Sequence, residues 1–308
     1  MQHILHPGTI DKSLLKLQAS HRSQKLWNEN IDCNEAVEPK ICDAAWTFFD
    51  NRPHQRVIEY ISRVGLWDVV RVGKIQLDHS LITAMIEQWR PETYTFHLPY
   101  GEVTMTLQDV QILFGLRVEG LPVVFPNLLY RNFDWDRLLQ VHTGFAPAPG
   151  DFTGNILLNI SVLIKYIRQQ VNQDPITDAT LDDRVLRIAR LLMLLILGAI
   201  LFPNTSGSSL SLRFLNFVID LDLTGTYSWG SAVLAYLYWC LCRIPIDGIK
   251  LGGFLPLLQL CYLIMLVSVC LFVILVNINY YVTFRYGLGR GSCPSNQYRL
   301  VILMRMSF

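Results

Sequence analysis

Apolar residues recur at three- and four-residue steps over most of the chain, which is the spacing of helices with one buried face. The pattern predicts helices over 54–64, 79–90, 107–115, 156–171, 183–201, 209–221 and 229–242. Asp78 stands where it can cap the second helix, and Thr106 with Asp109 forms a capping box before the third. We expect Ser228 to cap the last helix through its side chain.

The period changes from helical to alternating between residues 93 and 106. Tyr94, Phe96 and Leu98 alternate with polar residues, and the alternation resumes after a Pro-Tyr-Gly-Glu turn at 99–102. This pattern predicts a β-hairpin. The fold class is therefore mainly α, a multi-helix globular domain with one small β-hairpin, plus a C-terminal hydrophobic helix.

The composition excludes global disorder, because hydrophobic residues make up 51% of the chain and charged residues 17%. The net charge is +1, so charge gives no support for direct binding to nucleic acid. Seven cysteines contain no Cys-x-x-Cys pair, and we expect buried thiols rather than a metal site.

The motifs of common enzymes are missing from the sequence. Gly287-x-Gly289-x-Gly291 lacks the Lys-Ser/Thr pair of a phosphate-binding loop, and no Gly-x-Ser-x-Gly stretch exists. The adjacent Asp182 and Asp183 suit a helix N-terminus better than a catalytic pair. We therefore expect no enzyme activity, no catalytic residue, no cofactor and no metal.

Several stretches together resemble the plant mobile domain family. The opening resembles it at His6-Pro7-Gly8, His21-Arg22-Ser23 and Trp27. The strongest similarity runs from Gly73-Lys74-Ile75-Gln76-Leu77-Asp78 through Trp89-Arg90-Pro91-Glu92 to Thr106-Leu107-Gln108-Asp109 and Gly115-Leu116. A second signature is Gly225-Thr226-Tyr227-Ser228-Trp229-Gly230-Ser231-Ala232. The similarity covers roughly residues 6–259.

The resemblance implies a transposon-derived module in the nucleus, with a role in transposon silencing, gene expression or meristem maintenance. Its implied partners are nuclear proteins of silencing or transcription complexes. Relatives also carry an aminotransferase-like label, and some are fused to a phosphatase domain. An enzyme of either kind is the disfavoured alternative, because no catalytic residue carries over to this chain.

Two interpretations of the signature residues stay open. Trp89, Phe96 and Trp229 are large apolar anchors that suit one common core. Alternatively, the signatures border a groove that holds a partner. The candidate interaction surface then consists of Arg90, Glu92, Tyr227 and Ser228.

We divide the chain into an N-terminal extension at 1–50, the plant mobile domain at 51–259 and a hydrophobic segment with an unpatterned tail at 260–308. Residues 251–284 contain no charged residue. A misread or decayed coding end, which would truncate the domain, is one explanation. A membrane anchor through a helix at about 260–283 and a helix buried against the domain are the others. Membrane localisation is thus the alternative to the nucleus.

Overall fold

A computed structural model describes residues 15–24, 37–98, 101–125, 134–154, 156–247 and 250–267. The main α-helices of this part are α2 (Asp43–Phe48), α3 (Gln55–Arg63), α4 (Trp67–Val72), α5 (His79–Gln88), α6 (Leu107–Phe114), α7 (Trp135–Thr143), α8 (Ile160–Gln173), α9 (Asp182–Leu195), α10 (Leu221–Thr224) and α11 (Trp229–Asp247). The π-helical turn η3 (Ile196–Leu201) continues α9 directly. The 3-10 helices are η1 (Gln18–Ser20), η2 (Pro149–Asp151) and η4 (Leu212–Phe217).

The strands are short and form three small sheets. The sheets are β2 (Trp89–Arg90), β3 (Thr95–Leu98) and β4 (Gly101–Val103), antiparallel; β5 (Phe152–Thr153), β6 (Leu157–Asn159) and β7 (Ser209–Ser211), antiparallel; and β1 (Glu38–Pro39) with β8 (Lys250–Leu251), parallel. The structure confirms a mainly helical fold. The expectation of a single hairpin is wrong, because β5–β7 and the β1–β8 pair add strands that no local alternation signals.

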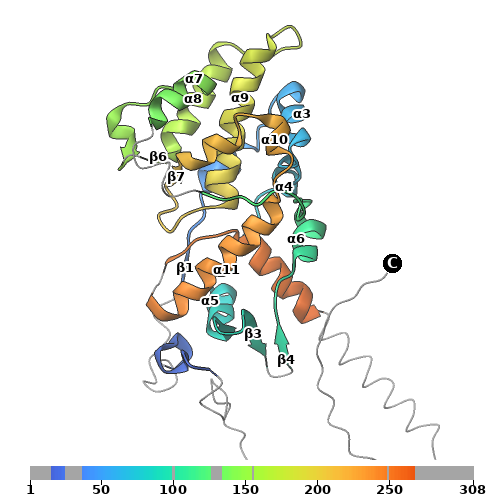
Figure 1. Cartoon of the computed structure of the whole chain (residues 1–308), viewed down its shortest axis with the longest axis vertical. Coiled ribbons are helices and arrows are strands. Elements are labelled where there is room, and N and C mark those ends of the chain that lie inside the picture. The colour runs from blue at the N-terminus through green and yellow to red at the C-terminus, as the bar shows by residue number, and fades with distance from the viewer. Residues whose placement is uncertain are drawn as a thin grey trace, which may run out of the picture.

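One continuous hydrophobic core runs through the described residues, from Val37 to Cys261. In Figure 1, α7, α8 and α9 gather at one end of the molecule, and α5 with β3 and β4 lies at the other. Helix α11 runs between the two ends, so it packs against partners from both halves.

Most predicted helices are present within a few residues of their expected bounds. Asp78 caps α5 by accepting a hydrogen bond from the Leu81 amide at 2.9 Å, and the Thr106–Asp109 capping box is formed. Helix α5 ends before Trp89, because that residue and Arg90 pair with β3.

The predicted helix at 209–221 is wrong. Ser209–Ser211 pairs with β6, the following residues form η4, and α10 begins only after Asp220. The start of the helix predicted over 156–171 is wrong as well. Leu157–Asn159 forms the strand β6, which pairs with β7. Apolar periodicity fails here because the backbone hydrogen bonds go to a sequence-distant strand.

Trp229, at the start of α11, belongs to the core. Its side chain is 1% exposed, and its indole N–H donates to the Thr224 carbonyl at 3.0 Å. Phe202, Phe217 and Tyr227 surround the ring at centroid distances of 5.7–6.4 Å. The next residue, Gly230, lies so close to the 116–118 loop that an added Cβ would meet backbone oxygens at 3.1 Å.

The packing continues past residue 259, where we placed the end of the domain. Residues 255–267 are helical, Cys261 is buried, and the ring of Tyr262 lies 6.1 Å from that of Phe96. The remaining hydrophobic segment and tail, 268–308, lie outside the described residues. Among the helices that are described, none has the length and apolar character needed to cross a membrane.

We expect Trp229→Ala to act through folding. Truncating a buried tryptophan lowers the free energy of unfolding by about 3–5 kcal/mol, and urea denaturation would measure this loss. Trp239→Ala on the same helix is the matched control, because that indole is 52% exposed and its truncation leaves no buried cavity. Equal unfolding midpoints for Trp229→Ala and the unmodified protein would contradict the core position of Trp229.

Candidate functional site

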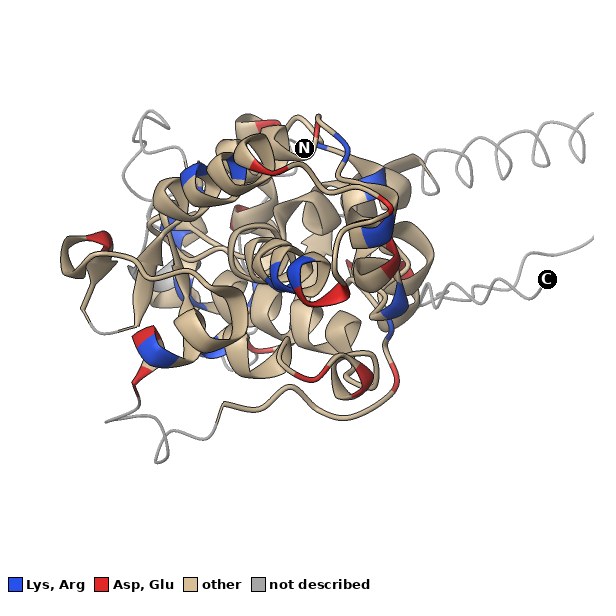
Figure 2. Cartoon of the chain, turned by 90° about the horizontal axis from the view of Figure 1, so that it is seen from above, with Lys and Arg blue, Asp and Glu red and all other residues tan. Residues whose placement is uncertain are grey.

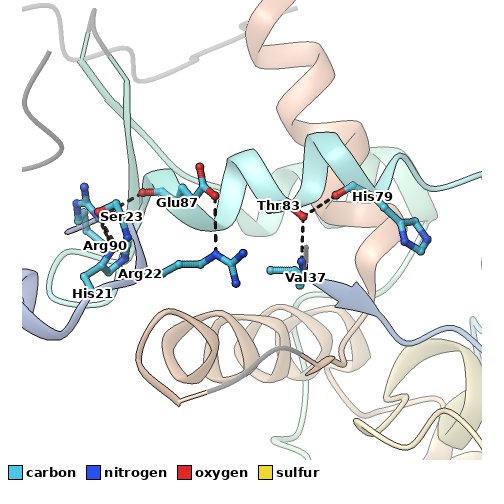
Figure 3. A network of polar contacts seen from close by, with 8 residues as sticks. All are labelled: His21, Arg22, Ser23, Val37, His79, Thr83, Glu87 and Arg90. Carbon is cyan, nitrogen blue, oxygen red and sulfur yellow. Dashed lines mark hydrogen bonds and ion pairs between the residues drawn. The ribbon is translucent and has the colours of Figure 1, made fainter. Parts of the chain in front are cut away.

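A chain of polar contacts connects the N-terminal segment to α5 (Figure 3). Arg22 pairs with Glu87 at 3.8 Å. About one turn before Glu87 on α5, the Thr83 hydroxyl donates to the His79 carbonyl at 2.8 Å and accepts from the Val37 amide at 3.1 Å. These contacts position β1 and the 15–24 segment on the same helix.

His21 and Arg90 form the buried end of this network, with exposures of 1% and 3%. The His21 Nε2–H donates to the Trp89 carbonyl at 2.9 Å, while the Ser23 hydroxyl donates to Nδ1 at 2.8 Å. The Arg90 Nη1 lies 3.0 Å and 3.1 Å from the two ring nitrogens. Burial, reinforced by the Arg90 charge, lowers the pKa of His21 to about 4, so the ring is neutral at physiological pH.

Glu92 completes the same junction. It is half-buried, and its Oε1 accepts a hydrogen bond from the Leu17 amide at 2.7 Å. Burial lowers the pKa of Arg90, while the charge of Glu92 acts against that shift. Arg90 and Glu92 therefore hold the 15–24 segment against β2.

Tyr227 and Ser228 belong to a different junction, at the start of α11. Ser228 is buried, and its hydroxyl donates to the Leu121 carbonyl at 3.0 Å. In the described part of the chain this hydroxyl bonds to the neighbouring loop and to no amide of α11, so the side-chain cap that we predicted is not formed. Tyr227 is half-buried, and its ring contacts those of Phe217 and Trp229.

The structure does not bring the two predicted pairs together. The Arg90 junction meets α11 near Tyr238, whose ring lies 5.3 Å from that of Trp89, whereas Tyr227 precedes Trp229. Tyr238 lies nine positions after Trp229, which is roughly 14 Å along a helix. Each pair makes its contacts at a separate internal junction, and Arg90 and Ser228 are both buried there.

Residues of the motifs that carry the family resemblance form hydrogen bonds with distant segments of the chain. Further hydrogen bonds of this kind join Gln259 to Gln76 and Asp78, Ser231 to Val118, and Arg117 to Gly225. Each bond links segments more than one hundred residues apart in the sequence. These signature residues thus take part in the contacts that hold distant segments of the chain together.

Within the described ranges, no group of three His, Cys, Asp or Glu side chains is arranged to hold a metal ion. Cys42, Cys240, Cys242 and Cys261 are free thiols. Burial raises the pKa of Cys240 to about 12, so its thiol stays protonated and a poor nucleophile at neutral pH.

One tryptophan differs from the others in its environment. Of the six that the structure describes, Trp46, Trp67, Trp89, Trp135 and Trp229 are at most 8% exposed. Trp239 is 52% exposed on α11. Tryptophan is enriched at the energetic centres of protein interfaces, so an exposed one marks a candidate contact site.

Two neighbours on the same helix hold the Trp239 indole in place. Tyr236 stacks on it with ring centroids 5.8 Å apart, and the Arg243 guanidinium carbon lies 4.7 Å from the ring centroid. Tyr236 is itself fixed, because its hydroxyl donates to the Pro203 carbonyl at 3.3 Å. We call Tyr236, Trp239 and Arg243 the aromatic patch.

Sequence reasoning missed the aromatic patch, although a signal was present. Helical residues rotate by about 100° each, so Trp239 falls on the side of α11 away from Val233 and Leu237. Because apolar residues occur on all sides of α11, the sequence did not indicate which side is exposed. In the view of Figure 2, acidic and basic residues are interspersed along the chain.

Comparisons with known proteins agree with this structure. The family model described as "Plant mobile domain" matches residues 65–270. The Arabidopsis thaliana "Serine/threonine-protein phosphatase 7 long form homolog" is 38% identical over 83% of this chain and 18% of its own length. From the same plant, "Protein MAIN-LIKE 2" is 31% identical over 84% of this chain and 37% of its own length. "Protein MAINTENANCE OF MERISTEMS", also from this plant, is 34% identical over 59% of this chain and 36% of its own length.

The chain spans less than half the length of these curated relatives. No solved structure matches it significantly. The family match covers two thirds of the chain and includes both signatures, whose residues form the internal junctions described above. The chain therefore belongs to the plant mobile domain family.

Proposed function

We propose that this chain is a noncatalytic interaction module of transposon origin that holds protein partners in nuclear silencing or transcription complexes. The names of two relatives, "MAIN-LIKE" and "MAINTENANCE OF MERISTEMS", support a role in meristem maintenance. The aromatic patch is the observation that supports the proposal, because it contains the exposed tryptophan of the described surface, and Tyr236 and Arg243 hold that side chain in place.

The chemistry of the patch defines its partner. An indole held between Tyr236 and Arg243 loses little conformational freedom on binding, which favours affinity. Arg243 is exposed, and Lys250 lies exposed on β8, which packs against α11. The partner is therefore a protein segment that places an apolar side chain on the indole and carboxylates beside the two cations.

We expect Trp239→Ala to remove nuclear partners without unfolding the protein. The measurement is quantitative proximity labelling in nuclei with a reporter fusion, together with the melting temperature of the purified variant. Truncation of an interface tryptophan typically costs at least about 2 kcal/mol of binding, so partner labelling should fall more than tenfold.

Ile112→Ala is the matched control, because Ile112 is 79% exposed on α6 and lies outside the patch. Its labelling pattern should equal that of the unmodified protein. An unchanged partner set for Trp239→Ala, or a fusion protein excluded from nuclei, would count against the proposed function.

The noncatalytic part of the proposal needs its own measurement. The phosphatase-named relative matches over only 18% of its length, so its name does not assign a phosphatase site to this chain. Purified full-length protein should not hydrolyse para-nitrophenyl phosphate and should not change the absorbance of pyridoxal phosphate. Turnover that disappears on replacing a single aspartate or lysine would overturn this expectation.

A membrane anchor is the second candidate function, favoured by one observation. Leu263, Ile264, Leu266 and Val267 are 36–58% exposed at the end of the helix at 255–267. The sequence stays free of charge from there to residue 284. An apolar face left uncovered at this point suits lipid better than burial against the domain.

If the anchor operates, full-length protein should pellet with membranes and resist carbonate extraction. The double substitution Val273→Arg, Leu275→Arg should release it, since each central arginine costs about 2.5–3.5 kcal/mol on insertion. A soluble, monodisperse full-length protein would exclude the anchor.

A further inference from the structure

A cavity of about 400 Å³ lies where α7, α8 and α9 meet, far along the chain from the aromatic patch. Its lining residues are Thr143, Gly144, Tyr166, Gln170, Asp183, Arg184, Arg187 and Ile188. Figure 1 shows these three helices side by side at one end of the molecule. Two arginines and one aspartate give this lining an excess of positive charge.

The two arginines lie on one face of α9, three residues apart, and carboxylates engage only part of each. Asp183 Oδ2 lies 2.9 Å from the Nε of Arg187, and Asp174 Oδ2 lies 3.0 Å from the Nε of Arg184. In the described part of the chain, no hydrogen bond uses the Nη groups of Arg187 or the Nη1 of Arg184, whereas the Nη2 of Arg184 donates to backbone carbonyls.

The Arg187 guanidinium reaches Gly144, the left-handed C-cap of α7 with φ +73°. A Cβ built on Gly144 would lie 3.5 Å from the Arg187 Nη1 and 3.7 Å from the Tyr166 hydroxyl. The missing side chain therefore leaves room at the point to which the guanidinium group reaches. Tyr166 is held there by its hydrogen bond to the Gly144 carbonyl, 3.0 Å, and by stacking on Phe145.

Arg190 adds to the positive charge behind the cavity. Its guanidinium donates to the carbonyls of His142 and Ile219 at 3.2 Å and 2.8 Å, and it forms no ion pair with a described carboxylate. The lining itself carries Arg184 and Arg187 against the single carboxylate of Asp183, which leaves one positive charge in excess. This charge selects an anion as the ligand.

We propose that this cavity binds the phosphate group of a phosphate monoester. Guanidinium forks pair with oxyanions, and a tetrahedral dianion offers separate oxygens to Arg184 and Arg187, whereas a carboxylate offers two in one plane. The volume exceeds that of phosphate alone and falls within the range of small-ligand sites, about 300–1,000 Å³. The site therefore has space for the group that carries the phosphate.

The test is isothermal titration calorimetry of the full-length protein with phenyl phosphate. Binding should be detectable at millimolar concentration, and Arg187→Ala should weaken it at least tenfold. Arg187→Lys should give an intermediate loss, because lysine keeps the charge without the fork. Dimethyl phosphate, a singly charged diester, should bind much more weakly.

Arg71→Ala is the matched control. Arg71 is also an exposed arginine paired with an aspartate on its own helix, Asp68 at 3.0 Å, but it lies on α4. This variant should bind as the unmodified protein does. Both substitutions remove surface ion pairs, so the melting temperature should change little.

Gly144→Asn provides an independent variant that fills the cavity, because asparagine tolerates a positive φ better than other side chains. It should also abolish binding.

Comparison of phenyl phosphate with a phosphoserine peptide identifies the molecule that carries the phosphate group. Tighter binding of the peptide indicates a phosphorylated protein, and equal binding indicates a small molecule. No heat of binding to phenyl phosphate, equal affinity for dimethyl phosphate, or full binding by Arg187→Ala would overturn the proposal.

Discussion

The fold depends on the packing of α11, which contributes large aromatic side chains to both halves of the core. At its start, the Trp229 indole is enclosed by aromatic rings and hydrogen-bonded to Thr224. Further along, the Tyr238 hydroxyl donates to the Met105 carbonyl at 2.5 Å and its ring contacts Trp89. Because one rigid helix makes both contacts, the two ends of the molecule are held at a fixed separation, and Trp239 is left facing outward.

Buried polar groups in and near the signature stretches have hydrogen-bond partners elsewhere in the fold. A polar group removed from water must find a partner, or folding loses roughly 1–3 kcal/mol for each one. His21, Arg90, Ser228 and Gln259 all find theirs in segments distant in the sequence. These polar side chains therefore act as matched donors and acceptors inside the fold.

The aromatic patch and the cavity at α7–α9 show two different uses of arginine. Arg243 lies over an exposed indole, where it orders an apolar contact surface. Arg184 donates to the carbonyls of Gln170 and Asp174, Arg187 pairs with Asp183 on its own helix, and both residues line the cavity. The first arrangement suits a protein segment and the second a compact anion, so the two sites need not share a ligand.

The sequence by itself determined the mainly helical class, the caps at Asp78 and Thr106, and the hairpin after Arg90, because each depends on residues near one another in the chain. Only the tertiary structure decided that 209–211 pairs with 157–159 and that Ser228 bonds to Leu121. It also decided that Arg90 is buried while Trp239 is exposed. Local periodicity reports which face of a segment is apolar, but the partner that covers that face comes from long-range packing.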